Sequence, residues 1–200
     1  VNGGTIAAST GTSSLNGTVV LGAASAVNVG GTQLTLTGIV SGAQALQKLG
    51  LGSLILTATN TYSGVTTIGA GNLTFRNDVP NLASSSFVGP GNLLVEPAGA
   101  NFTSAYTFNE VLSSATKLGG LTIGKAGSTQ NITTLTATDV AGPITLIGGT
   151  IAINAALTAS NAALNVTAGT AVTQTAAIVA KDVILQGAGA FTLTNTSNNV

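Results

Sequence analysis

The sequence predicts an all-β protein, a parallel β-helix (β-solenoid) of about ten coils with roughly 20 residues in each coil. Three observations lead to this fold class. Threonine, with 32 copies, outnumbers the ten charged residues and favours pleated, half-buried strands, while helix-forming residues are scarce. The 27 glycines and 17 asparagines favour many tight turns between short strands. Short apolar phrases recur at intervals of about 20 residues, which is typical of a solenoid.

The repeat is clearest in 31–95. A Gly-x-Leu phrase opens an apolar run in 52–56, 71–75 and 91–95, and a looser copy occupies 31–36. The phrases begin at Gly52, Gly71 and Gly91, and their leading leucines, which follow one another at steps of 20, 19 and 20, are Leu34, Leu54, Leu73 and Leu93. We expect each phrase to form a strand and each interval to form one coil, stacked about 4.8 Å from the next. An antiparallel sandwich also explains the strand content, but it does not require a constant step.

The last third of the chain has the same interval. Three sets of residues align at steps of 20, namely Gly149, Gly169 and Gly189; Ile144, Leu164 and Ile184; and Ile151, Ala171 and Phe191. Regular coils are therefore expected over 119–200.

The middle of the chain interrupts the repeat. The stretch 76–118 contains three of the four prolines and half of the charged residues, and Leu121 follows Leu93 at a step of 28, about eight more than one coil needs. We therefore divide the chain into β-helix coils in 1–75, irregular coils with an insertion in 76–118 and regular coils in 119–200. Insertions in solenoids map to one face, often the binding face. The candidate partner-binding loop contains Phe102, Tyr106, Phe108 and Glu110. The alternative is that these aromatic residues pack over an irregular coil.

The composition excludes several classes of function. Without Cys or His the chain has no disulfide, no thiol nucleophile, no Ser-His-Asp triad and no usual zinc or haem ligands. Five cationic side chains are too few for the roughly six to ten phosphate contacts of a duplex-binding site. No run approaches the roughly 18 apolar residues of a membrane-spanning helix. We expect no catalytic residues, no cofactor, no metal site, no nucleic-acid partner and no membrane span in this segment.

Two patterns suggest other functions. Asp78 and Glu96 are separated by slightly less than one coil, so they are expected on neighbouring coils, where paired carboxylates would suit polysaccharide cleavage. Solvated surface positions are the favoured explanation, because no further feature supports catalysis. Thr-x-Thr pairs also recur, as in ice-binding solenoids. A step of 20 aligns Thr173 with Ile153 and Leu193, which interrupts the row, so a general β-surface is the favoured interpretation.

The segment 36–73 resembles a known family repeat. Its phrases 36–42, 46–56 and 59–73, and above all Asn60-Thr61-Tyr62-Ser63-Gly64, are similar to the passenger-associated β-strand repeat of Gram-negative autotransporters. It departs from that pattern at Ala58, where the family usually has Gly, and at 49–51, where the Gly spacing is disturbed. More loosely, 144–154, 171–178 and 191–195 resemble filamentous-haemagglutinin-like exoproteins.

The two resemblances imply a right-handed β-helix that is exported to the bacterial outer surface or the extracellular space. They imply a role in adhesion, biofilm or surface architecture, with a host or abiotic surface, a glycan or a protein receptor as the partner, and no chemistry of its own. Neither end of the sequence shows a polar cap, so the chain is expected to be part of a longer rod or to pair end to end with copies of itself in a filament. The filament is the second reading, and an ice-binding or polysaccharide-acting β-helix is the third.

Overall fold

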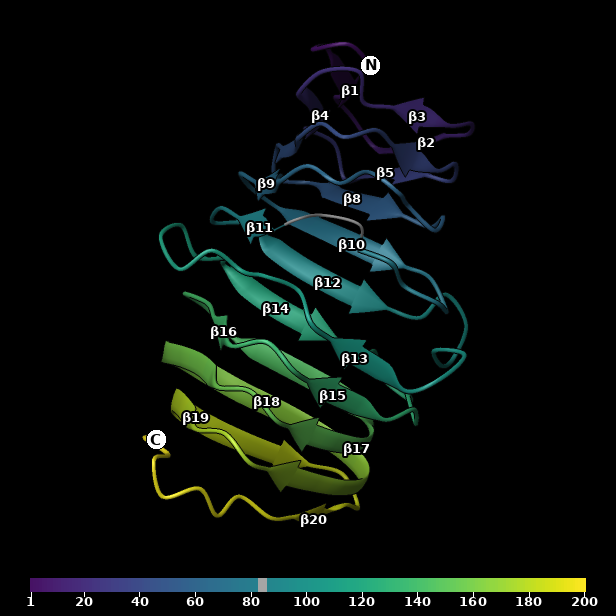
Figure 1. The fold of residues 1–200 in the computed structure, drawn as a ribbon. Coiled ribbons are helices and arrows are strands. Elements are labelled where there is room, and N and C mark those ends of the chain that lie inside the picture. The colour runs from purple at the N-terminus through teal and green to yellow at the C-terminus, as the bar shows by residue number, and fades with distance from the viewer. Residues whose placement is uncertain (83–85) are drawn as a thin grey trace.

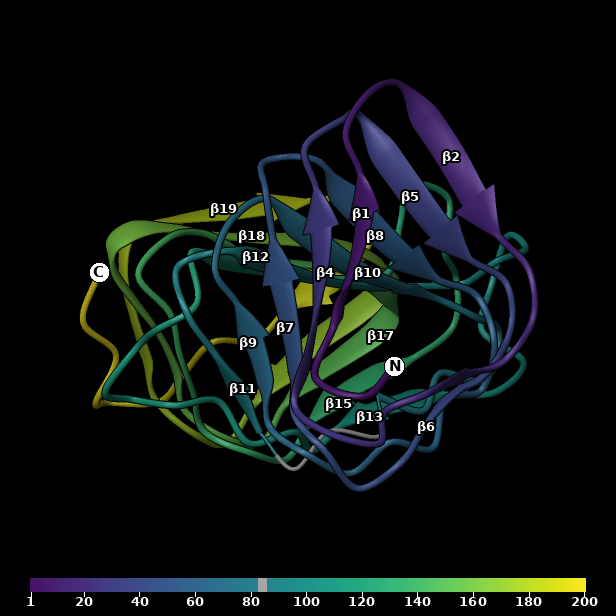
Figure 2. The ribbon, with the colours of Figure 1, turned by 90° about the horizontal axis from the view of Figure 1, so that it is seen from above.

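The computed structural model describes residues 1–82 and 86–200, and the regular elements in these residues are all β-strands. The chain winds into a parallel β-solenoid of about nine turns with about 20 residues per turn (Figure 1). Figure 2 looks along the axis from the N-terminal end. The strands β1, β4 and β7 point up the picture and β2 and β5 point down to the right, so the chain turns clockwise as it recedes. The solenoid is therefore right-handed, as the family resemblance implies.

Each coil contributes backbone to three walls. The first wall contains β1 (Thr5–Ala8), β4 (Ser25–Val29), β7 (Leu46–Leu49), β9 (Thr66–Ile68), β11 (Phe87–Val88) and β16 (Thr138–Asp139). The second wall contains β2 (Thr12–Leu15), β5 (Gln33–Leu36), β8 (Ser53–Leu56), β10 (Asn72–Arg76), β12 (Asn92–Glu96) and β14 (Gly120–Ile123). The third wall contains β3 (Val19–Val20), β6 (Val40–Ser41), β13 (Tyr106–Phe108), β15 (Ile132–Thr134) and β20 (Ala190–Phe191).

The last coils run through the corners without a break. The strands β17 (Ile144–Ile153), β18 (Leu157–Gln174) and β19 (Ile178–Gln186) each extend over more than one wall. β17 and β18 pair in parallel with the coils before and after them, and β19 pairs with β18. On the second wall they contribute 144–148, 163–168 and 182–186. The inner coils therefore satisfy their strand backbone groups by pairing with their neighbours, which is why the fold needs so little charge.

The leucines that mark the repeat are confirmed as one stacked row. Leu34 pairs with Leu54, Leu54 with Leu73, and Leu73 with Leu93 in the parallel register of the second wall. All four side chains point into the solenoid and are at most 3% exposed. An inward aliphatic residue at each step of the repeat thus builds the core.

The insertion predicted in the middle of the chain is also confirmed by the register. Leu93 pairs with Leu121, so the coil between them, which we call the long coil, exceeds a regular coil by about eight residues. Leu121 pairs with Ile144, so the coil that follows is longer than a regular one by about three. These two coils explain why the chain forms about nine turns and not the expected ten.

An isolated bridge shows where the surplus residues of the long coil lie. It joins Phe87 to Leu112 on the first wall. Leu112 follows Phe87 at a step of 25, five more than a regular coil. Five of the eight surplus residues therefore lie before the first wall, and the other three lie after it.

Of the alignments expected for the last third, Ile144 with Leu164 is confirmed, and the one at Ile151 is wrong by one residue. Ile151 pairs with Val172, not Ala171, and Val172 pairs with Phe191. The cause is a bulge: the register shifts between Gly148 and Thr150, where Gly149 and Gly169 lie. The shift places Val172, which is 0% exposed, in the core, where its side chain buries more apolar surface than the methyl group of Ala171.

A second irregularity, between Ala159 and Ala163, resets the register in the following coil. Leu164 pairs with Val183, so Ile184 lies beside Asn165 and faces outward. Gly189 donates its backbone N–H to the oxygen of Ala168, the residue before Gly169, as a residue aligned with Gly169 does in a parallel ladder. The expected alignment of these two glycines therefore holds, and the next residue, Ala190, pairs with Ala171.

Candidate functional site

Lys48 is a charged residue in an inward position. It lies on β7 between Val27 and Ile68 of the neighbouring coils and is 0% exposed. Its Nζ donates to the backbone oxygens of Leu49 (2.9 Å), Gly50 (2.7 Å) and Ala70 (3.0 Å). These carbonyls lie at the corner between the first and second walls, in two successive coils, and the three donors of an ammonium group satisfy all three. Burial lowers the pKa of Lys48 to about 8.

The Asn-Thr-Tyr motif holds a second corner. Asn60 is 0% exposed; its Oδ1 accepts from the backbone N–H of Val40 (2.8 Å) in the preceding coil, and its Nδ2 donates to the backbone oxygen of Ala58 (2.9 Å). Tyr62 is also fully buried, and its hydroxyl lies 3.0 Å from Oγ1 of Thr66. Burial, together with the nearby negative charge of Glu110, raises the pKa of Tyr62. Asn60 therefore joins two coils, and the other polar contacts of this motif are local.

Other charged side chains also join one coil to the next. Nε of Arg76 lies 2.6 Å from Oε1 of Glu96, and Nζ of Lys117 lies 2.8 Å from Oδ1 of Asp139. Nζ of Lys125 donates to the backbone oxygens of Pro97 (3.0 Å) and Ala98 (3.3 Å) in the coil before it. Each pair spans neighbouring coils.

The candidate partner-binding loop lies largely inside the molecule. Phe102, Tyr106 and Phe108 are 3%, 8% and 0% exposed and belong to the hydrophobic core. The rings of Phe102 and Tyr106 stack with their centroids 4.9 Å apart. In the register of the third wall Tyr106 pairs with Ile132 and Phe108 with Thr134, so the long coil has aromatic side chains where the next coil has smaller ones. The burial supports the other interpretation given above, in which these aromatic residues pack over an irregular coil, and it contradicts a partner-binding role for the three rings.

Glu110 is the member of that loop that remains partly exposed. Burial raises the pKa of its carboxyl group above the ordinary value, and its negative charge adds to the burial that raises the pKa of Tyr106. Glu110 thus lies near two buried tyrosine rings, Tyr62 and Tyr106, in a poorly solvated position.

The two carboxylates considered for catalysis have separate structural partners. Oδ1 of Asp78 accepts from the backbone N–H of Gly99 (2.8 Å), and Glu96 pairs with Arg76. They do lie on neighbouring coils, as the spacing predicts, because Arg76 pairs with Glu96 in the register of β10 and β12.

The outward positions of the second wall form a continuous row, which we call the outer row. In chain order it contains Ser14, Thr35, Ile55, Thr74, Leu94, Thr122, Thr145, Asn165 and Ile184. Threonine alternates irregularly with aliphatic and amide side chains in it. This wall therefore lacks the uniform threonine lattice on which the ice-binding reading depends.

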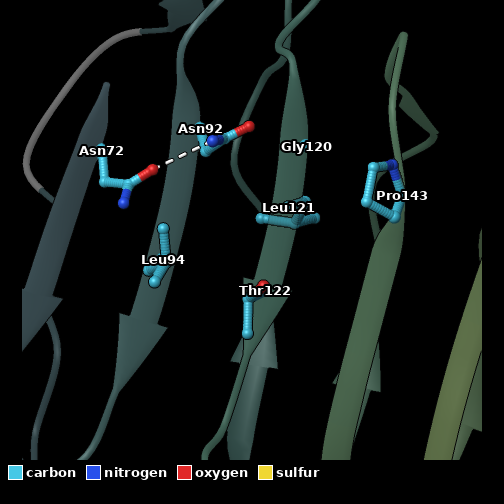
Figure 3. A pocket seen from close by; sticks show the side chains of 7 residues that line it. All are labelled: Asn72, Asn92, Leu94, Gly120, Leu121, Thr122 and Pro143. Carbon is cyan, nitrogen blue, oxygen red and sulfur yellow. Dashed lines mark hydrogen bonds between the residues drawn. The ribbon is translucent and has the colours of Figure 1, made fainter. Parts of the chain in front are cut away.

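A shallow pocket of about 240 Å³ opens on the outside of the second wall (Figure 3). It is lined by Asn72, Asn92, Leu94, Gly120, Leu121, Thr122 and Pro143, which come from β10, β12, β14 and the start of β17. The pocket was not evident in the sequence, because Asn92 and Gly120 become neighbours only through the long coil. The one available signal was the Asn that follows Gly in both 71–75 and 91–95.

No protein-family model, curated protein or solved structure matches this chain. In the part of the chain that the structure describes, no helix has the length and hydropathy needed to cross a membrane. Among the same residues, no group of three or more acidic side chains is close enough together to hold a metal ion.

Proposed function

We propose that this chain is a non-enzymatic structural and adhesive segment of a bacterial surface protein, within the passenger of an autotransporter or a two-partner exoprotein. One observation carries the structural part of the proposal. Lys48, Asn60, Lys125 and the pairs Arg76–Glu96 and Lys117–Asp139 all use their polar atoms to join successive coils. These side chains are engaged in holding a rod together.

The family resemblance supports the cellular setting. The residues that carry it, 36–73, include Lys48, Asn60 and Tyr62, and all three are buried between coils. A motif whose polar residues serve coil stacking suits an exported rod that presents its walls to an outside surface. The proposed location is the outer cell surface or the extracellular space, and the proposed partner is a host or abiotic surface.

Adhesion is tested by retention under flow. Beads coated with the folded chain are passed over glass, polystyrene and immobilised neutral polysaccharide, beside beads coated with albumin or with the heat-unfolded chain. We expect the folded chain to hold more beads than either control on at least one surface. Retention equal to albumin on every surface contradicts the adhesive role.

The non-enzymatic part is tested by assaying for new reducing ends in neutral and uronate polysaccharides. We expect none above background. Turnover that disappears in Asp78→Asn or Glu96→Gln overturns this part of the proposal.

A self-assembling filament is the second candidate, and it would use the strand edges of the first and last coils. On the second wall β2 pairs with β5 on one side, and β19 pairs with β18 on one side. Further coils of a longer rod would cover these edges, and so would a second copy of the chain. Fibres that lengthen with concentration in electron micrographs support the filament, and a monodisperse monomer at high concentration excludes it.

A further inference from the structure

The pocket on the second wall exists because one side chain is missing from a regular row. Asn72, Asn92 and Gly120 stack in register on β10, β12 and β14, and the next residue in this row is Pro143. Gly120 has no side chain between the Asn92 amide and the Pro143 ring, so a hollow remains there. The hollow is narrow at its floor, where a Cβ atom added at Gly120 would lie 3.1 Å from the backbone oxygen of Pro143. Its volume of about 240 Å³ limits a ligand to about one sugar ring.

The amide of Asn92 is held with its oxygen toward this hollow. Its Nδ2 donates to Oδ1 of Asn72 at 2.9 Å, which commits the nitrogen to the preceding coil (Figure 3). Its Oδ1 points the other way, so that a Cβ atom added at Gly120 would lie 3.2 Å from it. Among the described contacts this oxygen accepts no hydrogen bond from the protein. It is a pre-oriented acceptor at the edge of an apolar hollow.

The rest of the lining is uncharged and largely apolar. Leu94 and Pro143 provide aliphatic surface, and Thr122 provides a hydroxyl group. A ligand that fits must offer a hydrogen-bond donor beside an apolar face, and it must carry no charge that a neutral lining would leave unpaired.

We infer that this pocket binds a single neutral hexopyranose unit of a glycan. A ring hydroxyl donates to Oδ1 of Asn92, and the C–H face of the ring packs on Leu94 and Pro143. The inference rests on the proposed adhesive function and names the chemistry of its partner. One shallow pocket gives weak binding, with a Kd of about 1–10 mM. Many copies on one cell surface would convert this into firm attachment.

The arrangement discriminates against other ligands. A uronate would place its carboxylate near the acceptor oxygen of Asn92, which disfavours it. A calcium ion needs about six to eight oxygen ligands, and the lining side chains offer far fewer. A lysine side chain from a peptide is the main competitor, because it also donates to an amide oxygen.

The test is a titration of the ¹⁵N-labelled chain, followed by the NMR shifts of its backbone amides. The probes are methyl glycosides of glucose, galactose, mannose and N-acetylglucosamine, with methyl glucuronate and a blocked lysine amide for comparison. We expect at least one neutral glycoside to give saturable shifts confined to 92–94 and 120–122. No saturable shift there with any neutral glycoside overturns the inference, and so does saturation there by the lysine amide alone.

Three variants sharpen the result. Asn92→Ala removes the acceptor oxygen, and we expect roughly tenfold weaker binding. Gly120→Ala places a methyl group in the hollow and is expected to weaken binding as well. The matched control is Asn28→Ala, at an exposed asparagine on β4 of the first wall, which leaves binding unchanged. Asn92→Ala and Gly120→Ala chains that bind as tightly as Asn28→Ala contradict the site.

The two proposals fail separately. Bead retention without glycoside shifts overturns the pocket and leaves the adhesive role standing. Glycoside shifts without bead retention overturn the adhesive role and leave the pocket standing.

Discussion

Lys48 shows how single residues in this chain satisfy backbone groups where a coil turns. Its ammonium group caps three carbonyl oxygens that lie in two coils. A buried carbonyl without a donor costs about 1–3 kcal/mol, so the lysine stabilises the corner although its own charge is poorly solvated. The sequence contains a signal for this role, because Lys48 falls one coil after Val27 and one coil before Ile68, in an inward row.

We predict that Lys48→Met lowers the free energy of unfolding by about 1–3 kcal/mol, measured by urea denaturation. Methionine keeps much of the apolar stem and removes the three donors. The control is Lys181→Met, an exposed lysine, for which a change within about 0.5 kcal/mol is expected. A Lys48→Met chain as stable as the wild type contradicts the capping role.

Glu110 predicts a dependence of stability on pH. Its carboxyl pKa is raised in the folded chain above the ordinary 4.5, so just above pH 4.5 the folded state keeps a proton that the unfolded state releases. Stability therefore falls as the pH rises through this window. We expect Glu110→Gln to gain stability over the wild type as the pH rises from about 4 to 7, measured as a difference in Tm.

The control for Glu110 is Asp182→Asn, which removes an exposed acid from the last coil. Its Tm is expected to follow the wild-type pH profile. Parallel profiles for Glu110→Gln and the wild type would show that burial of this carboxyl group costs nothing.

Neighbouring coils approach so closely at some glycines that a side chain there would clash with the backbone of the adjacent coil. A Cβ atom added at Gly142 would lie 1.8 Å from the backbone oxygen of Gly119 in the preceding coil. The same atom at Gly169, on β18, meets nothing closer than 3.9 Å. An added Cβ atom would therefore clash with the neighbouring coil at Gly142 but not at Gly169. Neither glycine has a positive φ, so the two substitutions differ only in this clash.

We predict that Gly142→Ala destabilises the chain by about 2–3 kcal/mol, whereas Gly169→Ala changes its stability by less than about 1 kcal/mol. Chemical denaturation of both variants measures the difference. Equal stability would mean that the coils are not stacked at this distance.

The strands of the second wall were predictable from sequence, and their last registers were not. The leucine row from Leu34 to Leu93 repeats at almost constant steps, and each leucine directly follows a polar residue, so its phase is unambiguous. In 144–191 Gly, Ala, Thr and Ile alternate in several phases, and a one-residue bulge decides which of Ala171 and Val172 faces the core. The larger side chain, Val172, is the one that is buried. A fixed step of 20 residues takes no account of side-chain size, so it could not predict this.

The pocket could not be predicted for a related reason. Its walls come from coils of unequal length, so residues 72, 92, 120 and 143 show no common spacing. The aromatic residues of the insertion misled for the opposite reason. Exposed loops and widened cores both use aromatic side chains, and only the surrounding coil shows that Phe102 and Phe108 are buried.

The whole molecule is a rod whose length depends on the number of coils and not on the number of residues. Nine strands stack on the second wall, so it extends over about 38 Å. The long coil widens the cross-section and adds the same height as a shorter one. The stacking role of the buried polar residues and the geometry of the pocket both depend on this constant rise.

Distances between spin labels on the outer row test the constant rise most directly. The chain has no cysteine, so labels are placed cleanly on Ser14→Cys and, in turn, on cysteines replacing Leu94, Thr122, Thr145 and Asn165. Pulsed electron paramagnetic resonance is predicted to give about 19, 24, 29 and 34 Å, rising by about 4.8 Å per coil. The step from Leu94 to Thr122 crosses the long coil and must equal the others. Distances that do not rise in this order, as an antiparallel sandwich would give, contradict the solenoid.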